Sequence, residues 1–456
     1  SQNTAIGATT LRLNTTGSEN TALGYAAMDA NTTGFGSTGL GHSALGAMTT
    51  AQYNTAVGYN AAGVTTTGNK NVAVGAFALD ANTTASHNTA IGYDSATANT
   101  TGSDNVVIGA FASDASTTAS QGVAVGYEAL GSLTTGSFNT AVGYQAAFSL
   151  TTGTQIVAIG RHALYSNTSG TQNTALGYSA LYGNTTGHSN TAAGYASLIS
   201  NTEGAENTGY GRDTLYFNTT GDGNTAIGNE ALENNSTASG NTAVGSHALT
   251  ANTTGSLHVA VGIDALTSNT TGNNNTAIGR QSMYHNTTGN SNVAVGLNAL
   301  QQNTTANENV AIGRNTLVNN TTGTLNTAVG AYAGNSVTTG GDNTLIGHNC
   351  GQAITTAGAN TFIGRNAGQL NTGSDNTYIG QRCAENMTTG TGNIAIGKEA
   401  SPSSNTSSGQ CVLGSGGISV LRCNVQTISS LSDQRDKTDI IDLPIGLDFI
   451  KTLKPR

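Results

Sequence analysis

The chain has 456 residues, of which 62 are glycine, only 9% are charged and none is tryptophan, and its formal net charge is −9. A weakly acidic chain without a basic patch does not suit nucleic-acid binding. No apolar stretch approaches the roughly 20 residues of a membrane span. We therefore expect neither nucleic-acid binding nor membrane insertion, and the choice lies between disorder and a repetitive fold.

A repeat of 17 residues, present from the first residues of the chain, favours a repetitive fold over disorder. A glycine recurs every 17 residues from Gly7 to Gly364; one residue is then missing, and the series resumes at Gly380, Gly397 and Gly414. The residue before this glycine is Ile, Leu or Val in 23 of 25 repeats. A disordered chain has no physical reason to hold that phase, whereas a fixed period of this kind is typical of a solenoid.

We number the unit from its asparagine, so that residues 173–189 are positions 1 to 17. Asn-Thr-Ala-Leu-Gly then takes positions 1 to 5, and Asn-Thr-Thr-Gly takes positions 12 to 15. The unit is too short for a helical hairpin. Its strand-like start and its Gly- and Asn-rich corners predict one coil with two short strands and two turns. The predicted fold is therefore an all-β parallel β-solenoid (β-roll) over residues 1–415. At about 4.8 Å per coil, it would be a rod on the order of 120 Å long.

Equivalent positions of successive units should stack in columns. Ile or Val at position 4 and Ala at positions 3 and 8 should form a thin core, and Asn at position 1 should form a ladder along one corner. A lone rod of such small coils is marginal. We therefore expect a homotrimer, either a three-fold bundle that buries the position 9 leucines or an intertwined triple helix. The position 9 leucines, which would fill the wider end of the coil or face a neighbouring chain, include Leu79, Leu130, Leu164, Leu181, Leu232 and Leu249.

The four cysteines do not form a disulfide framework. Cys350 and Cys383 share position 8 two coils apart. Their Cα atoms would lie about 10 Å apart, too far for a bridge, so we expect two buried thiols. A bridge between Cys411 and Cys423 stays open. The eight histidines have no Cys or carboxylate partner at ligand spacing, so we expect no metal and no cofactor.

Position 6 carries two sets of side chains that could contact glycans or a neighbouring chain, although such columns more often serve packing. The first set is Tyr25, Tyr59, Tyr93, Tyr127, Tyr144, Tyr178 and Tyr195, and the second is Arg161, Arg212, Arg280, Arg314, Arg365 and Lys398.

The recurring Asn-Thr-Thr is a formal N-glycosylation acceptor, which would give a sugar column if the producing cell uses it. The alternative is that the corner is chosen for its turn geometry. The acceptors are Asn14, Asn31, Asn82, Asn99, Asn184, Asn218, Asn252, Asn269, Asn286, Asn303 and Asn320.

The C-terminal segment departs from the repeat. Residues 416–431 alternate loosely and predict a β-strand connector. From Ser432 the composition changes, because ten of the 24 residues from Asp433 to Arg456 are charged. We expect residues 432–456 to be the N-terminal piece of another domain.

Two resemblances concern these parts. The coil unit, as in residues 88–92, resembles the head repeats of trimeric autotransporter adhesins. Two runs follow the connector, Ser-Asp-Gln-Arg-Asp-Lys-Thr-Asp-Ile at residues 432–440 and Gly-Leu-Asp-Phe-Ile-Lys-Thr-Leu-Lys-Pro at residues 446–455. They resemble the opening of the endosialidase-type intramolecular chaperone domain of bacteriophage tail fibres and tailspikes, which trimerises, guides folding of the shaft and then cuts itself off. This resemblance implies Ser432 as nucleophile and Lys437 as its base, with Asp433 and Arg435 in support. Asp436 stands where that family usually has Leu, and Asp439 where it usually has Asn.

These observations predict the shaft of a trimeric viral fibre, located in the virion tail or at an extracellular surface. Its partners would be further copies of itself and a host cell-surface receptor or glycan. Its only enzymology would be a single self-cleavage. The alternative is a bacterial surface adhesin or extracellular fibril protein with a glycosylated or glycan-binding rod. An ice-binding solenoid would stack Thr-x-Thr on a flat face, whereas the threonine pairs here are adjacent and lie on a corner.

Overall fold

The computed structural model describes residues 2–415, and this range forms a parallel β-solenoid with one three-residue strand per coil and no helix. The strands are β1 (Thr4–Ile6), β2 (Thr21–Leu23), β3 (Thr38–Leu40), β4 (Thr55–Val57), β5 (Val72–Val74), β6 (Thr89–Ile91), β7 (Val106–Ile108), β8 (Val123–Val125), β9 (Thr140–Val142), β10 (Val157–Ile159), β11 (Thr174–Leu176), β12 (Thr191–Ala193), β13 (Thr208–Tyr210), β14 (Thr225–Ile227), β15 (Thr242–Val244), β16 (Val259–Val261), β17 (Thr276–Ile278), β18 (Val293–Val295), β19 (Val310–Ile312), β20 (Thr327–Val329), β21 (Thr344–Ile346), β22 (Thr361–Ile363), β23 (Thr377–Ile379), β24 (Ile394–Ile396) and β25 (Cys411–Leu413).

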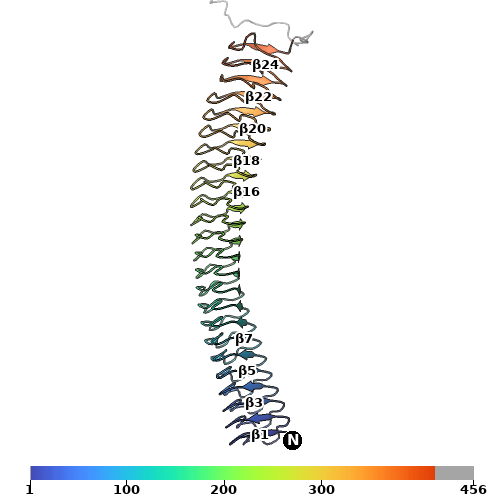
Figure 1. Ribbon diagram of the computed structural model, residues 1–456, viewed down its shortest axis with the longest axis vertical. Helices are drawn as coiled ribbons and strands as arrows, with labels where there is room; N and C mark the ends of the chain where they lie inside the picture. Colours follow the sequence, from blue (N-terminus) through green and yellow to red (C-terminus); the bar gives the residue numbers. More distant parts are fainter. Residues whose placement is uncertain (1, 416–456) are drawn as a thin grey trace, which may run out of the picture. The chain divides into compact units, whose positions relative to one another are not determined.

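Each strand pairs in parallel with the strand of the next coil, residue for residue. In β11 and β12, for example, Thr174 lies opposite Thr191 and Ala175 opposite Ala192. The predicted stacking of equivalent positions is therefore confirmed. Figure 1 shows the coils piled into a column whose strand arrows point to opposite sides at its two ends, so the strand face winds around the column.

The expected second strand of each coil is absent, and the backbone dihedral angles give the reason. In the coil of β11, Gly177 has a φ of 135°, and Ser179, Leu181 and Ser189 have φ values of 52°, 52° and 58°. The same pattern recurs in successive coils. A residue with a φ of this kind does not continue a strand. Positions 5, 7, 9 and 17 therefore change the direction of the backbone in each coil, and no second strand can form between them.

The interior of the coil combines small apolar columns with a leucine column. Alanines at positions 3 and 8 are buried as predicted, and the leucines at position 9 are also buried within their own coil, except Leu11 in the first coil, which is partly buried. Leu164 and Leu181 have no exposed surface. The expected three-fold bundle that buries the leucine column is therefore wrong in that detail, because these leucines are already buried inside their own coils.

The position 4 column points outward, which corrects the expectation that it lies in the core. Side chains alternate between the two faces of a strand. Because Ala at position 3 points inward, the Ile or Val beside it must point outward, and none of the position 4 residues from Ile6 to Leu413 is buried.

The core changes its layout near the C-terminal end of the described range. Position 9 becomes glycine at Gly334, Gly351 and Gly368, while position 3 enlarges to Leu345 and then Phe362 and Tyr378. A Cβ on Gly351 would lie 2.7 Å from Leu345 Cδ2. In these coils the large side chain is at position 3 and the small one at position 9, the reverse of the other coils, so that the core volume stays nearly the same.

One coil lacks a residue, and the stack accommodates the loss. Between Gly364 and Gly380 the corner reads Asn371-Thr372-Gly373, so the second threonine is missing. The strands keep their register, with Thr361 opposite Thr377. The deletion falls on an outward corner position, which explains why it does not shift the strands.

Candidate functional site

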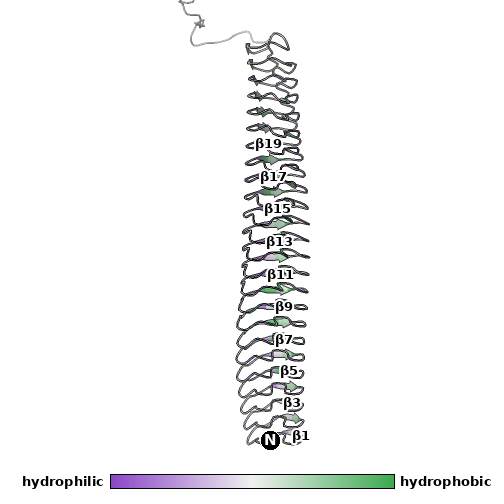
Figure 2. Cartoon of the chain, turned by 90° about the vertical axis from the view of Figure 1, so that its left-hand side faces the viewer, coloured by the Kyte–Doolittle hydropathy of each residue, from purple (hydrophilic) through white to green (hydrophobic). Residues whose placement is uncertain are grey.

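The strand face is an outward surface whose chemistry is nearly constant along the solenoid. Position 2 is Thr or Val in most coils, and position 4 is almost always Ile, Val or Leu. Ile227, Ile278 and Ile363 are 42%, 38% and 36% exposed. Figure 2 shows the strands as a file of largely hydrophobic residues along the solenoid. A contiguous apolar surface of this length is typical of an interaction face.

The predicted asparagine ladder at position 1 exists, and it lies inside the coil. The Asn173 Oδ1 accepts a hydrogen bond from the backbone N–H of Asn190 at 3.0 Å, and its Nδ2 donates to the Gly187 carbonyl at 2.8 Å. Each side chain thus joins one coil to the next and closes its own coil. Because buried polar groups require such partners, this column is structural.

A second asparagine ladder at position 12 was read from the sequence only as turn residues or glycosylation acceptors. Asn184 Nδ2 donates to Asn167 Oδ1 at 2.8 Å and to the Gly187 carbonyl at 3.0 Å. These bonds repeat without a break from Asn167 to Asn320. Before Met48 and Val337, which interrupt the column, the Oδ1 atoms of Asn31 and Asn320 have no hydrogen-bond partner.

This geometry bears on the glycosylation acceptors. All of them except Asn14 are buried, at 0–2% exposure. Their amide nitrogens donate hydrogen bonds within the coil, as described for Asn184. Turn and ladder geometry therefore accounts for this column, and attachment of a sugar would have to precede folding or break the ladder.

His258 replaces asparagine at position 1. Its Nδ1 lies 3.2 Å from the backbone N of Asn275, and its Nε2 lies 2.6 Å from the Gly272 carbonyl oxygen. A backbone N–H can only donate, so Nδ1 accepts and Nε2 carries the proton. The side chain is fully buried, and burial lowers the pKa of His258 to about 4.

An aromatic ladder covers the outside of the N-terminal half. The position 6 tyrosines of the sequence analysis are 41–56% exposed. Where position 6 is Ala or Arg, an aromatic residue at position 7 fills the gap, so ring centroids follow each other at 5.0–6.5 Å. The ladder comprises Tyr25, His42, Tyr59, Phe77, Tyr93, Phe111, Tyr127, Tyr144, His162, Tyr178 and Tyr195.

The rings of this ladder mostly pack against each other. Tyr127 and Tyr144 are stacked at an interplanar angle of 12°, and Tyr178 and Tyr195 at 8°. Arg161 interrupts the row with its guanidinium 5.7 Å from the Tyr144 ring centroid and 5.6 Å from that of Tyr178. Ring faces engaged in this way stabilise neighbouring coils, which favours packing over glycan stacking for this column.

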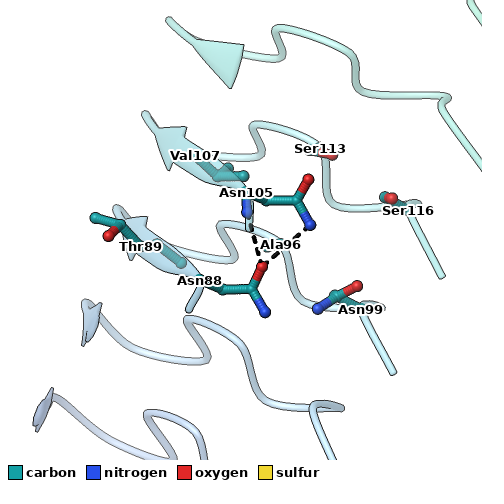
Figure 3. Close-up of a pocket in the computed structure, with 9 residues that line it drawn as sticks. Asn88, Thr89, Ala96, Asn99, Asn105, Val107, Ser113 and Ser116 are labelled. Carbon is teal, nitrogen blue, oxygen red and sulfur yellow. Dashed lines mark hydrogen bonds between the residues drawn. The ribbon is translucent and has the colours of Figure 1, made fainter. Parts of the chain in front are cut away.

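Internal space in the described coils is small. Figure 3 shows a cavity beside Asn88 and Asn105, where position 9 is only Ala96 or Ser113 instead of Leu. Its volume is about 10 Å³, enough for one water molecule. Asn105 Nδ2 donates across it to Asn88 Oδ1 at 3.1 Å. This cavity is a packing defect of two coils and is too small for a larger ligand.

The cysteines behave as small buried side chains. The thiols of Cys350 and Cys383 donate to the Phe362 and Ala395 carbonyls at 3.2 and 3.1 Å, and neither is bridged. Burial raises the pKa of Cys350 to about 12 and that of Cys383 to about 11. Thiols held protonated in this way are unreactive.

Within residues 2–415, His, Cys, Asp and Glu side chains do not gather in groups of three or more that could hold a metal ion. The same range contains no helix long and apolar enough to cross a membrane.

The residues assigned to self-cleavage, namely Ser432, Asp433, Arg435 and Lys437, lie outside the described residues. So do Cys423, the connector 416–431 and the segment 432–456. Their roles stay predictions from the sequence.

Comparisons with protein-family models, with curated proteins and with solved structures give no match for this chain.

Proposed function

We propose that this chain is the shaft of an extracellular fibre, built from three parallel copies that meet through their strand faces. The observation that carries the proposal is the position 4 column, which is apolar along the whole rod and half exposed in a single chain. The described residues form a long rod whose surface repeats from coil to coil. A shaft uses both that length and that repeating surface.

The energetics favour association through this face. Completing the burial of a side chain such as Ile227, which is 42% exposed, contributes about 1 kcal/mol. One such contact is weak, but the column repeats it in every coil. Because the strand face winds around the column, copies that match position 4 to position 4 over their full length would wind around one another. Three-fold closure follows the resemblance to the trimeric autotransporter head repeats.

The test is a pair of charges on the strand face. Ile227→Lys with Ile278→Lys removes two of these contacts and adds repelling charges, so it should lower the urea concentration at which the mass measured by light scattering falls from three chains to one, while the far-ultraviolet circular dichroism in buffer keeps its β signal. Thr237→Lys with Thr288→Lys adds the same charges at corner positions of the same coils and should leave that urea concentration unchanged. A shift with both pairs, or with neither, would contradict the proposal.

Between the fibre classes, we favour a viral tail fibre because of the chaperone-like pattern from Ser432. In that reading the C-terminal segment assembles the trimer, and the rod displays an element that attaches to a host cell-surface receptor or glycan. Intact mass of the chain expressed with its complete C-terminal domain should show one cleavage in the parent and none in Ser432→Ala. The same mass in both would remove the self-processing step.

The second candidate is a bacterial surface adhesin or extracellular fibril protein. It shares the strand-face trimer and is favoured by the resemblance of residues 88–92 to adhesin head repeats. The cleavage experiment separates the two candidates, because an adhesin shaft has no need of a self-cleaving chaperone.

A further inference from the structure

The outward columns of the rod differ in how constant they are. Positions 6, 7, 10, 16 and 17 vary freely between charged, aromatic, small and polar residues. Position 14 does not vary in this way. From Thr16 to Thr389 it is threonine in every coil that has the position, except for Ser169 and Glu203, and each of these side chains is exposed.

The fold accounts for the first threonine of each corner. The hydroxyl of Thr185 at position 13 donates to the Thr202 carbonyl of the next coil at 3.0 Å. Such bonds follow one another from Thr15 through Thr338, with Ser236 as the one serine. Position 13 must therefore carry a hydroxyl, because it ties successive corners together.

The fold does not account for the second threonine. In the described residues, the hydroxyls at position 14, such as that of Thr186, make no intramolecular hydrogen bond, in contrast to those at position 13. The coil that lacks position 14 keeps the corner intact, with Thr372 Oγ1 donating to the Thr388 carbonyl at 3.0 Å. A residue that is constant, exposed and dispensable for the corner points to a role outside the fold.

The N-glycosylation pattern does not explain this threonine either. Position 14 stays threonine where position 12 is Met48, Leu133, Leu150, Val337 or Ile354, so that no acceptor asparagine precedes it. Where the asparagine is present, it is buried, except at Asn14. The threonine hydroxyl, and not the asparagine amide, is the accessible nucleophile of this corner.

We propose that the position 14 threonines are O-glycosylation acceptors, which would make this corner a sugar-bearing edge of the rod. In the reaction, a glycosyltransferase would activate a threonine Oγ1, which attacks the anomeric carbon of a nucleotide-activated sugar. The new C–O bond replaces the sugar–phosphate bond, the nucleotide leaves, and the hydroxyl proton passes to the transferase. The acceptors recur at the coil spacing of about 4.8 Å.

A neutral sugar suits this edge better than a phosphate does. Phosphorylated threonines in successive coils would place negative charges of nearly two units each at about that spacing, and the like charges would repel. Sugars add bulk and hydration without that repulsion. A chain with only 9% charged residues would gain solubility from them.

The experiment uses the protein isolated from the cells that naturally produce it. Peptides spanning the corner of β11 should carry a hexose-type mass increment that is lost on alkaline β-elimination, with electron-transfer fragmentation placing it on Thr186. Thr186→Val should remove the increment from that peptide and leave stability in urea unchanged. The matched variant Thr185→Val should keep the increment and lower stability, because it removes the hydroxyl that bonds to the next coil.

Two results would overturn the proposal: peptides from native protein that are unmodified at position 14, or sugars carried mainly by other columns. The outcome is independent of the proposed trimer, because the strand face and this corner are separate positions of the coil. A monomeric but glycosylated rod would refute the shaft assembly alone.

Discussion

Substitution of one glycine in the position 5 column should open the solenoid locally. Gly177 has a φ of 135°, and a Cβ there would overlap the Gly194 carbonyl oxygen and lie 2.8 Å from its carbon. Both atoms belong to the backbone of the next coil, so no side chain can move aside. Relief requires the two coils to separate, which strains the bonds from Gly194 N–H to the Leu176 carbonyl at 2.8 Å and from Ala196 N–H to the Tyr178 carbonyl at 3.0 Å.

The expected loss of stability has two contributions, the backbone conformation and the hydrogen bonds between the coils. The unfavourable φ costs about 1–3 kcal/mol, and two weakened hydrogen bonds cost about 1 kcal/mol each. Gly177→Ala should therefore lower local stability by about 3–5 kcal/mol. Because solenoids unfold by segments, we would measure this by native-state hydrogen exchange, in which amides of the coils of β11 and β12 should lose protection while distant coils do not.

A second glycine provides the control. Gly223 has a φ of 63°, and a Cβ there would meet nothing within 4 Å. The same position is occupied by Glu206 and Asn274 at φ values of 59° and 57°. Gly223→Asn should therefore change stability by less than about 1 kcal/mol. If Gly177→Ala proves as mild as Gly223→Asn, the close approach of coils through the glycine column is refuted.

Three further predictions concern the interior. Because the folded pKa of His258 lies below its ordinary value, the coil of β16 should be fully stable above about pH 6.5 and lose about 3 kcal/mol as the pH falls to about 4. Urea titrations at pH 7 and pH 4 should show this loss, and His258→Asn should abolish it; an equal acid loss in the variant would exclude the histidine as its cause. Asn218→Asp removes two donors from the second ladder and should cost about 3 kcal/mol at pH 7, with partial recovery in acid when the carboxyl is protonated; an unchanged urea midpoint would show that the ladder carries no stability. Gly351→Leu and Leu345→Ala should each lower the free energy of unfolding by about 2–4 kcal/mol. In a double-mutant cycle the double variant should recover part of this loss. Strictly additive losses would show that the side chains at positions 3 and 9 do not compensate for each other.

The sequence predicted the stacking because one physical constraint recurs in every unit. A backbone so close to the next coil that no Cβ fits demands glycine, as at Gly177, and this gives the period directly. Which apolar residues point inward was harder to predict. Ile looked more core-like than Ala, yet strand alternation allows only one of two neighbours to face inward, and a coil this thin has room for Ala.

Other features were present in the sequence but were read separately. The aromatic ladder emerges only when positions 6 and 7 are read together, since Phe77 and Phe111 fill the gaps left by alanines. The second asparagine ladder looked like turn chemistry because its partners lie 17 residues away. The position 14 threonine could not be separated from its neighbour by sequence, because only hydrogen bonding and exposure distinguish Thr185 from Thr186.

The most direct test of the proposed shaft is the cross-section of the isolated wild-type rod by cryo-electron microscopy at a resolution that separates the coils. We expect three coils around one axis with the position 4 side chains, such as Ile227, facing that axis and the Thr186 corner facing outward. A single coil in cross-section, or three coils that meet through the threonine corner, would contradict it.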